Sequence, residues 1–158
     1  MYRMISETGF ELIMSFESLS LESYQDSNGI WSIGYSHSDN VIQGQKIEEL
    51  TAMSLLQSDI MICEECLNNI VAVPLNQNQF DALVSFLFNV GVGHPGVKSG
   101  FQYLKSGQPS NMLININKGN FVDAADEFSY WIYMGSIRSP SLVKRREKEM
   151  KLFMTKEA

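Results

Sequence analysis

The chain has 158 residues, of which 44% are hydrophobic, and this is enough to bury roughly two thirds of the unfolded surface without a disulfide or metal staple. Its formal net charge of −6 argues against a general affinity for nucleic acid or for anionic membranes. No run approaches the ~18 apolar residues of a membrane span, and the first residues lack the apolar core of a secretory signal.

The chain begins with a predicted amphipathic helix followed by a hairpin. Ser6 is placed to cap the helix, which runs to about Glu17. Its apolar residues recur at helical spacing, at Phe10, Ile13 and Met14. Strand-type residues then stand on both sides of a turn, at Tyr24, Trp31, Ile33 and Tyr35. The turn, Ser27-Asn28-Gly29, contains a residue that tolerates positive φ and a glycine, so a two-stranded hairpin is predicted.

Three polar residues around this hairpin are the candidate catalytic residues. Glu17 lies where the helix is expected to end, Asp26 just before the turn, and Ser32 beyond it. Hydrolysis of a sugar acetal needs a protonated acid at the leaving oxygen and a carboxylate that acts through water. A hydroxyl beyond the turn can help to hold that water. Such residues are also common on ordinary surfaces, so the spacing by itself leaves both interpretations open.

A long helix is predicted from about Lys46 to Ile70. Its apolar residues recur at alternating steps of four and three, at Leu56, Ile60, Cys63, Leu67 and Ile70. Cys63 and Cys66 lie within this helix, and the histidines, His37 and His94, are remote from them in sequence. We therefore expect two free thiols, with neither a redox centre nor a metal site.

The second half of the chain is predicted to be helical. A wide apolar face from Gln77 onward is typical of a helix inside a bundle, and Gly91 is placed to end it. Residues 93–110 are rich in glycine. A last helix is predicted to begin with Ser139 as its cap and Pro140 as its first residue. Its basic residues would normally form a solvated face, and they predict a local positive zone made of Lys144, Arg145, Arg146 and Lys148.

Three segments, in this order along the chain, resemble one known family. They are FESLSLESYQDSNGIWSIGYSH at 16–37, QNQFDALVSFLFNVG at 77–91 and SPSLVKRREKEMKLF at 139–153. Together they resemble the phage-type lysozymes, glycoside hydrolase family 24, over about Phe10 to Phe153. The resemblance implies one α+β, lysozyme-like domain over residues 1–158. In it, a small β-hairpin lobe at about 18–45 is joined by the long helix to a helical lobe, with a cleft between them. The helical lobe would comprise about 75–158 and the N-terminal helix.

The resemblance also implies an activity, the hydrolysis of the β-1,4 bond between N-acetylmuramic acid and N-acetylglucosamine in bacterial peptidoglycan. Glu17 would protonate the leaving oxygen, while Asp26, with Ser32, would position or activate the attacking water. No metal or organic cofactor is implied. Further residues implied by the resemblance are Phe88 and Asn89 lining the sugar cleft, His37 bracing the hairpin, and either Arg145 or Arg146 lying near Glu17.

Three serines depart from the family's pattern. The family usually has glycine at the position of Ser18, threonine at Ser32 and glycine at Ser36. Ser32 keeps the hydroxyl but loses the methyl group that restricts its rotamer. Glycine often marks a positive φ or a close backbone contact, so Ser18 and Ser36 are expected to reshape the floor of the site.

Two functions remain open at this point. The first is an active muramidase, most simply a phage endolysin that is made in the host cytoplasm and reaches the wall through a pore or a secretion system. The alternative is a repurposed or weakly active lysozyme fold that binds wall fragments or a protein partner. Retention of both carboxyl groups favours the enzyme. The expected partner is the peptidoglycan glycan strand, with no nucleic acid and no stable membrane insertion, and the chain is expected to be a monomer.

Overall fold

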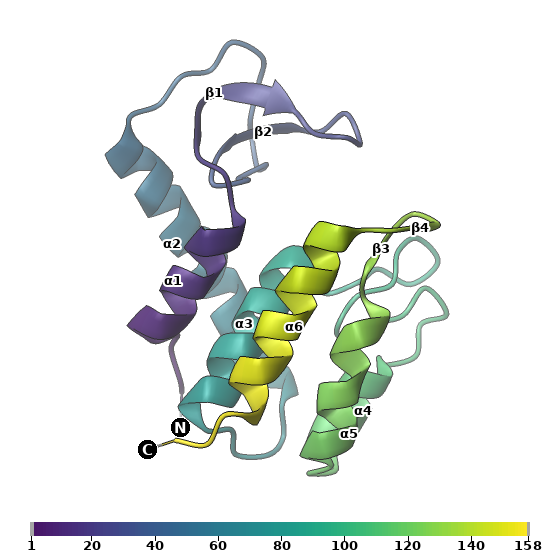
Figure 1. Ribbon diagram of the computed structural model, residues 1–158. Coiled ribbons are helices and arrows are strands. Elements are labelled where there is room, and N and C mark those ends of the chain that lie inside the picture. Colours follow the sequence, from purple (N-terminus) through teal and green to yellow (C-terminus); the bar gives the residue numbers. More distant parts are fainter. Residues whose placement is uncertain (1, 158) are drawn as a thin grey trace. The chain divides into compact units, whose positions relative to one another are not determined.

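The computed structural model describes residues 2–157, which combine helices with two small hairpins (Figure 1). In chain order the elements are α1 (Glu7–Phe16), β1 (Ser20–Gln25), β2 (Trp31–Gly34), α2 (Glu49–Ile70), α3 (Gln77–Val90), α4 (Asn111–Asn117), α5 (Phe121–Glu127), the 3-10 helix η1 (Phe128–Tyr130), β3 (Tyr133–Met134), β4 (Ile137–Arg138) and α6 (Pro140–Met154). The predicted α+β class is confirmed. Within the described part of the chain, no helix has the length and apolar content that a membrane span requires.

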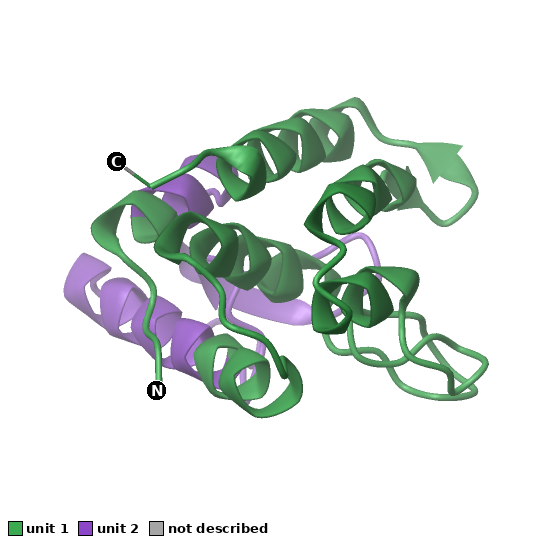
Figure 2. Ribbon diagram, turned by 90° about the horizontal axis from the view of Figure 1, so that it is seen from below, with its two compact units in different colours: residues 1–10, 63–158 green, residues 11–62 purple. Residues whose placement is uncertain are grey.

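The chain divides into two compact units (Figure 2). We call residues 11–62 the hairpin unit, and residues 1–10 with 63–158 the helical unit. The boundaries fall inside α1 and α2. The predicted division into lobes at about 18–45 and 75–158 stays a prediction.

The hairpin unit is organised by the antiparallel pair β1 and β2, in which Tyr24 pairs with Ser32. The turn that joins the strands is closed by the Asp26 N–H, which donates to the Ile30 carbonyl at 2.9 Å. Gly29 adopts φ +78°, the left-handed conformation that a three-residue hairpin turn places at its last position. The predicted hairpin is therefore confirmed. Asn28, which tolerates positive φ, does not adopt it.

Residues 45–47 pair with β1, and the long helix therefore starts later than predicted. The Ser23 N–H donates to the Gln45 carbonyl, and the Ile47 N–H donates to the Leu21 carbonyl, each at 2.9 Å. Residues 45–47 are paired with β1 in an antiparallel arrangement, so they are not part of the helix. The predicted start near Lys46 is wrong, since α2 begins at Glu49, whereas the predicted end at Ile70 is confirmed.

The helical unit is built around α3, which packs against α6 (Figure 1). Residues 80–87 of α3 are all buried, and Phe86 lies among aromatic rings. Its ring meets that of Phe128 edge to face at 5.3 Å between centroids, and that of Trp131 at 5.6 Å. Phe153 of α6 meets Phe128 in the same way at 5.6 Å. These rings fix α3 and α6 against the segment that follows α5.

The ends of α3 and α6 follow from their capping residues. Gly91 adopts φ +84° and its N–H donates to the Leu87 carbonyl at 2.8 Å. Ser139 Oγ accepts the Leu142 N–H at 3.3 Å, and Pro140 is the first residue of α6. Both predicted boundaries are confirmed. The short helices α4 and α5 and the hairpin β3–β4 were not predicted from the sequence.

Candidate active site

Glu17 follows the last residue of α1, where its N–H donates to the Ile13 carbonyl at 3.2 Å. The helix therefore ends where the sequence predicted. The side chain of Glu17 is partly exposed, and its Oε2 accepts a hydrogen bond from the Ser36 hydroxyl at 2.7 Å. The carboxyl group is thus held by a neutral donor while it remains accessible to solvent.

Asp26 is held by the backbone of the hairpin turn. Its Oδ1 accepts the N–H of Asn28 at 2.8 Å and the N–H of Ile30 at 2.9 Å. Aspartate commonly organises a turn in this way, by binding backbone N–H groups a few residues further on. Both of these hydrogen bonds are made to Oδ1, and no group among residues 2–157 donates a hydrogen bond to Oδ2 of Asp26. One carboxylate oxygen is therefore fixed by the turn, and the other can accept a hydrogen bond from a ligand.

Ser32 lies in β2 and is buried, with 4% of its surface exposed. It pairs with Tyr24, and Asp26 stands two residues beyond Tyr24. Side chains directly across an antiparallel pair share a face, as do residues two apart on one strand. Tyr24 and Ser32 therefore share a face of the hairpin, and Asp26 follows directly after β1.

His37 is anchored within the hairpin unit. Its Nδ1 lies 2.8 Å from Oδ2 of Asp59 in α2, and its Nε2 lies 3.0 Å from the Asp39 carbonyl oxygen. Both partner atoms are hydrogen-bond acceptors. Among the described residues, His37 bonds to these groups rather than to Glu17 or Asp26. It fixes the segment that follows β2.

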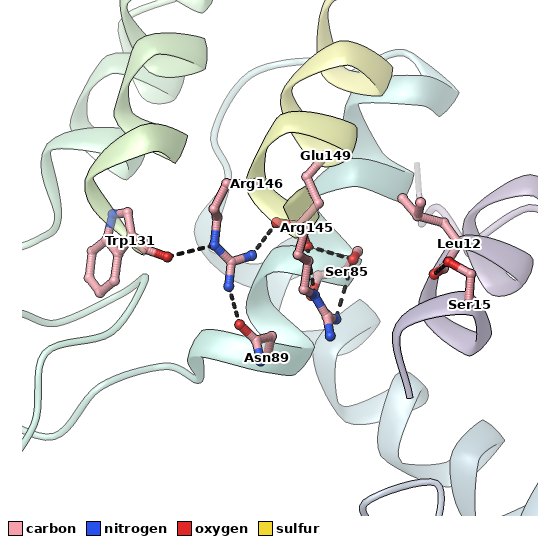
Figure 3. A network of polar contacts seen from close by, with 8 residues as sticks. All are labelled: Leu12, Ser15, Ser85, Asn89, Trp131, Arg145, Arg146 and Glu149. Atoms are coloured by element: carbon pink, nitrogen blue, oxygen red, sulfur yellow. Dashed lines mark hydrogen bonds and ion pairs between the residues drawn. The ribbon is translucent and has the colours of Figure 1, made fainter. Parts of the chain in front are cut away.

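Arg145 and Arg146 lie in a buried polar network of the helical unit (Figure 3). Arg145 Nε donates to Oε2 of Glu149 at 3.2 Å, and the same oxygen accepts from Ser85 Oγ at 2.6 Å. Arg146 Nη1 donates to Oε1 of Glu149, and its Nε donates to the Trp131 carbonyl at 2.9 Å. Glu149 is 0% exposed and the two arginines 4% and 2%. One carboxylate therefore binds two guanidinium groups away from water.

The prediction that the basic residues of α6 form a solvated face is wrong for both arginines, because they are buried. Arg145 and Arg146 point into the unit, so of the predicted positive zone only Lys144 and Lys148 are exposed. Removal from water lowers the pKa of Arg146, and the charge of Glu149 partly opposes that change. The guanidinium also lies over the Phe86 ring, 4.9 Å from its centroid.

The two predicted substrate-binding residues lie at the end of α3. Phe88 is half-buried and Asn89 is exposed. Asn89 Oδ1 accepts a hydrogen bond from Arg146 Nη2, so the network that holds α6 to α3 also orients this amide (Figure 3). The Asn89 amide nitrogen remains a donor for a ligand.

Both cysteines lie in α2. Neither Cys63 nor Cys66 forms a disulfide, and both are half-buried, as predicted. Burial raises the pKa of the Cys66 thiol, which lowers its reactivity at neutral pH. Within the described part of the chain, no three His, Cys, Asp or Glu residues are grouped so that they could hold a metal ion.

Several residues of these networks were missed by sequence reasoning. Asp59 and Ser85 lie on helices far in sequence from their partners, His37 and Glu149, and no local pattern marks them. The signal for Glu149 was its spacing, three and four residues after the two arginines. Ser36 was noted only as a departure from the family's pattern, and its bond to Glu17 was not foreseen.

An α+β fold whose hairpin unit carries two candidate catalytic carboxyl groups is the arrangement that the resemblance to the lysozymes predicted. Residues 14–149 match the family described as phage lysozyme. The chain is 40% identical over 157 residues to the endolysin of Bacillus phage B103, covering 98% of this chain and 55% of that protein. It is 35% identical to the endolysin of Acyrthosiphon pisum secondary endosymbiont phage 1, covering 94% of this chain and 97% of that protein. Among solved structures, the muramidase domain of SpmX from Asticaccaulis excentricus gives a TM-score of 0.81 at 36% identity, covering 98% of this chain and all of that one.

The chain therefore belongs to the phage lysozyme family, as its resemblance predicted. The expected class of enzyme, a glycoside hydrolase acting on peptidoglycan, is confirmed at the level of this family. The chain spans about half the length of the Bacillus phage B103 relative and nearly the whole length of the endosymbiont phage relative.

Proposed function

We propose that this chain hydrolyses the β-1,4 bond between N-acetylmuramic acid and N-acetylglucosamine in peptidoglycan. The observation that carries the proposal is that Glu17 and Asp26 lie in one compact unit but in different surroundings. The Glu17 carboxyl accepts from a hydroxyl, whereas one Asp26 oxygen is held by two backbone N–H groups. Two carboxyl groups in different surroundings suit the two roles that glycoside hydrolysis requires.

In the proposed reaction, Glu17 gives its proton to the leaving glycosidic oxygen. Asp26 and Ser32 hold the attacking water, with Oδ2 of Asp26 as the acceptor because Oδ1 is occupied by the turn. The Asp26 carboxylate also opposes the positive charge that develops on the sugar ring in the transition state.

The remaining site residues have binding or supporting roles in this proposal. Phe88 and Asn89 contact the sugar chain, and Arg146 orients Asn89. Arg145 supports α3 through the Ser85 carbonyl, which accepts from its Nη2 at 3.0 Å. His37 braces the segment after β2 through Asp59.

For the whole protein, we propose the role of a phage endolysin, as the names of the relatives suggest. It would be made in the host cytoplasm and would act on the wall after release through a pore or a secretion system. Its partner would be the glycan strands of peptidoglycan, with no nucleic acid and no stable membrane insertion. We expect it to act as a monomer.

A second candidate is a repurposed or weakly active fold that binds wall fragments or a protein partner. The observation in its favour is that Ser18, Ser32 and Ser36 all depart from the family's pattern around the candidate catalytic residues. Such a protein would sediment with purified walls without clearing them.

The deciding experiment measures the rate at which Glu17→Gln clears a suspension of purified cell walls. Clearing is followed by the loss of turbidity. The amide cannot deliver a proton, and general acid assistance is worth about 10²–10⁴-fold, so the rate should fall at least a hundredfold. Glu11→Gln, an exposed change in the same helix, serves as the control and should clear at the parent's rate. A Glu17→Gln variant with more than about a third of the parent's rate removes Glu17 from the role of acid. A parent protein that binds walls without clearing them supports the second candidate.

A further inference from the structure

Ser36 has a backbone conformation that is unusual for a residue with a side chain. Its φ is +64°, and among residues 2–157 only one other non-glycine residue, Asn40 with φ +56°, has a positive φ. Asparagine tolerates this region more readily than serine, which has no comparable preference for it. The Ser36 side chain is also exposed, so burial in a core does not hold it there.

The surrounding turn fixes the position of Ser36. Ile33 and His37 exchange two backbone hydrogen bonds, of 2.8 and 2.9 Å, across the three residues between them. Gly34, the first of the three, also has a positive φ, of +67°. His37 is in turn held by Asp59. The backbone of Ser36 is therefore set by contacts on both sides, and its side chain leaves the turn in a defined direction.

The Ser36 side chain points at the candidate general acid. Its Oγ lies 2.7 Å from Oε2 of Glu17, a normal length for a hydroxyl bonded to a carboxyl group. A hydroxyl can donate to an ionised carboxylate and can also accept from a protonated acid. It can therefore stay bonded to Glu17 before and after proton transfer. A glycine at this position cannot do this.

We propose that Ser36 is a positioning residue, which holds the carboxyl group of Glu17 in the orientation needed for proton delivery. The inference rests on the proposed role of Glu17. Glutamate has three rotatable side-chain bonds, so a fixed partner removes orientations from which the proton cannot reach the leaving oxygen. The chain keeps the left-handed turn that glycine would allow and adds a hydrogen bond to the acid.

The test compares Ser36→Gly with Ser36→Ala on soluble peptidoglycan fragments. Both remove the hydroxyl, but glycine relieves the left-handed strain and alanine keeps it. We expect kcat to fall about three- to tenfold in both, with KM nearly unchanged, because only the orientation of the acid is lost. The melting temperature should separate them, with Ser36→Gly at or above Ser36→Ala. A merely structural role would instead make activity follow stability.

Asn40→Gly is the matched control, since it relieves the same strain a few residues away, and it should keep the parent's kcat. A Ser36→Gly variant with the parent's kcat overturns the inference. So does a rise in KM with kcat unchanged, or an equal loss of kcat in Asn40→Gly. Glu17→Gln separates this inference from the proposed function. If Glu17→Gln still clears walls, the proposed function fails. If it is inactive while Ser36→Gly is fully active, only the role of Ser36 fails.

Discussion

At the scale of single residues, Glu149 is a buried carboxylate of the helical unit that is bound through both of its oxygens. Its two oxygens bind both buried arginines and Ser85. Replacing one partner of a buried charge pair leaves the other charged without compensation, which costs far more than the pair contributes. Glu149 therefore balances charges that the fold has already removed from water, and α3 and α6 depend on it together.

We expect Glu149→Gln to lower the free energy of unfolding by about 3–5 kcal/mol, because the buried guanidinium groups of Arg145 and Arg146 would lose the carboxylate that both of them bind. The measurement is urea unfolding followed by circular dichroism. Glu147→Gln, an exposed change on the same helix, should alter stability by less than about 0.5 kcal/mol. A loss below about 1 kcal/mol for Glu149→Gln would mean that water reaches the arginines once the carboxylate is gone.

The sequence predicted single residues well where the signal was local. Glu17 at the end of α1 and the turn around Gly29 depend on neighbours in the chain, and both were located correctly. The burial of Arg145 was not predicted, because a run of basic residues has the same pattern whether it faces solvent or a carboxylate from the same helix. The partner of His37, Asp59, is 22 residues away, and no sequence spacing indicates such a pair.

At the scale of elements, the glycine-rich segment 93–110 is held by a close backbone contact. A Cβ added to Gly93, whose φ is +88°, would lie 1.9 Å from the Tyr103 carbonyl oxygen and 2.6 Å from the Gly100 nitrogen. Gly100 is equally crowded by the backbone of Gly93. Because neither glycine has a Cβ, the backbone around Gly93 can lie in direct contact with the backbone around Gly100. This contact explains why the segment contains glycine at both positions.

Gly93→Ala should therefore destabilise the protein by about 3 kcal/mol or more, since the clash is with backbone atoms and adds to the left-handed strain. Gly96→Ala is the matched control. It has φ +79° but nothing within 4 Å of an added Cβ, so it should cost only the strain, about 1–2 kcal/mol. Thermal unfolding of the two variants side by side checks this. Equal losses would show that the loop relaxes around the new methyl group.

Among the elements, long periodic helices were predictable and short ones were not. The apolar repeat and caps located α3 and α6. The start of α2 was placed too early, because residues 45–47 pair with β1 and this long-range pairing overrides local helix propensity. The helices α4 and α5 have seven residues each, too few for a periodic pattern to be distinguished from a loop.

At the scale of the whole molecule, the fold class and the family could be predicted from three matched segments of the sequence. The distribution of charge could not, because it depends on which residues belong to each of the two units. Residues 11–62 contain eight acidic side chains and one lysine, which gives −7. The remaining residues contain ten acidic and eleven basic side chains, which gives +1 and accounts for the total of −6. The unit that carries Glu17 and Asp26 is therefore the acidic one.

This distribution predicts how activity depends on salt. An acidic unit that approaches an anionic wall is repelled at low ionic strength, and exposed charges are screened beyond about 8–10 Å at physiological salt. The clearing rate should rise from about 10 mM salt to an intermediate optimum before about 300 mM.

A double variant, Glu22→Gln with Glu48→Gln, removes two exposed charges from the hairpin unit and should move the optimum to lower salt. Glu65→Gln with Glu147→Gln removes the same charge from the helical unit and should move it less, because that unit is nearly neutral. A rate that falls steadily from the lowest salt upward, or equal shifts in both pairs, would show that repulsion by the hairpin unit does not limit the approach to the wall.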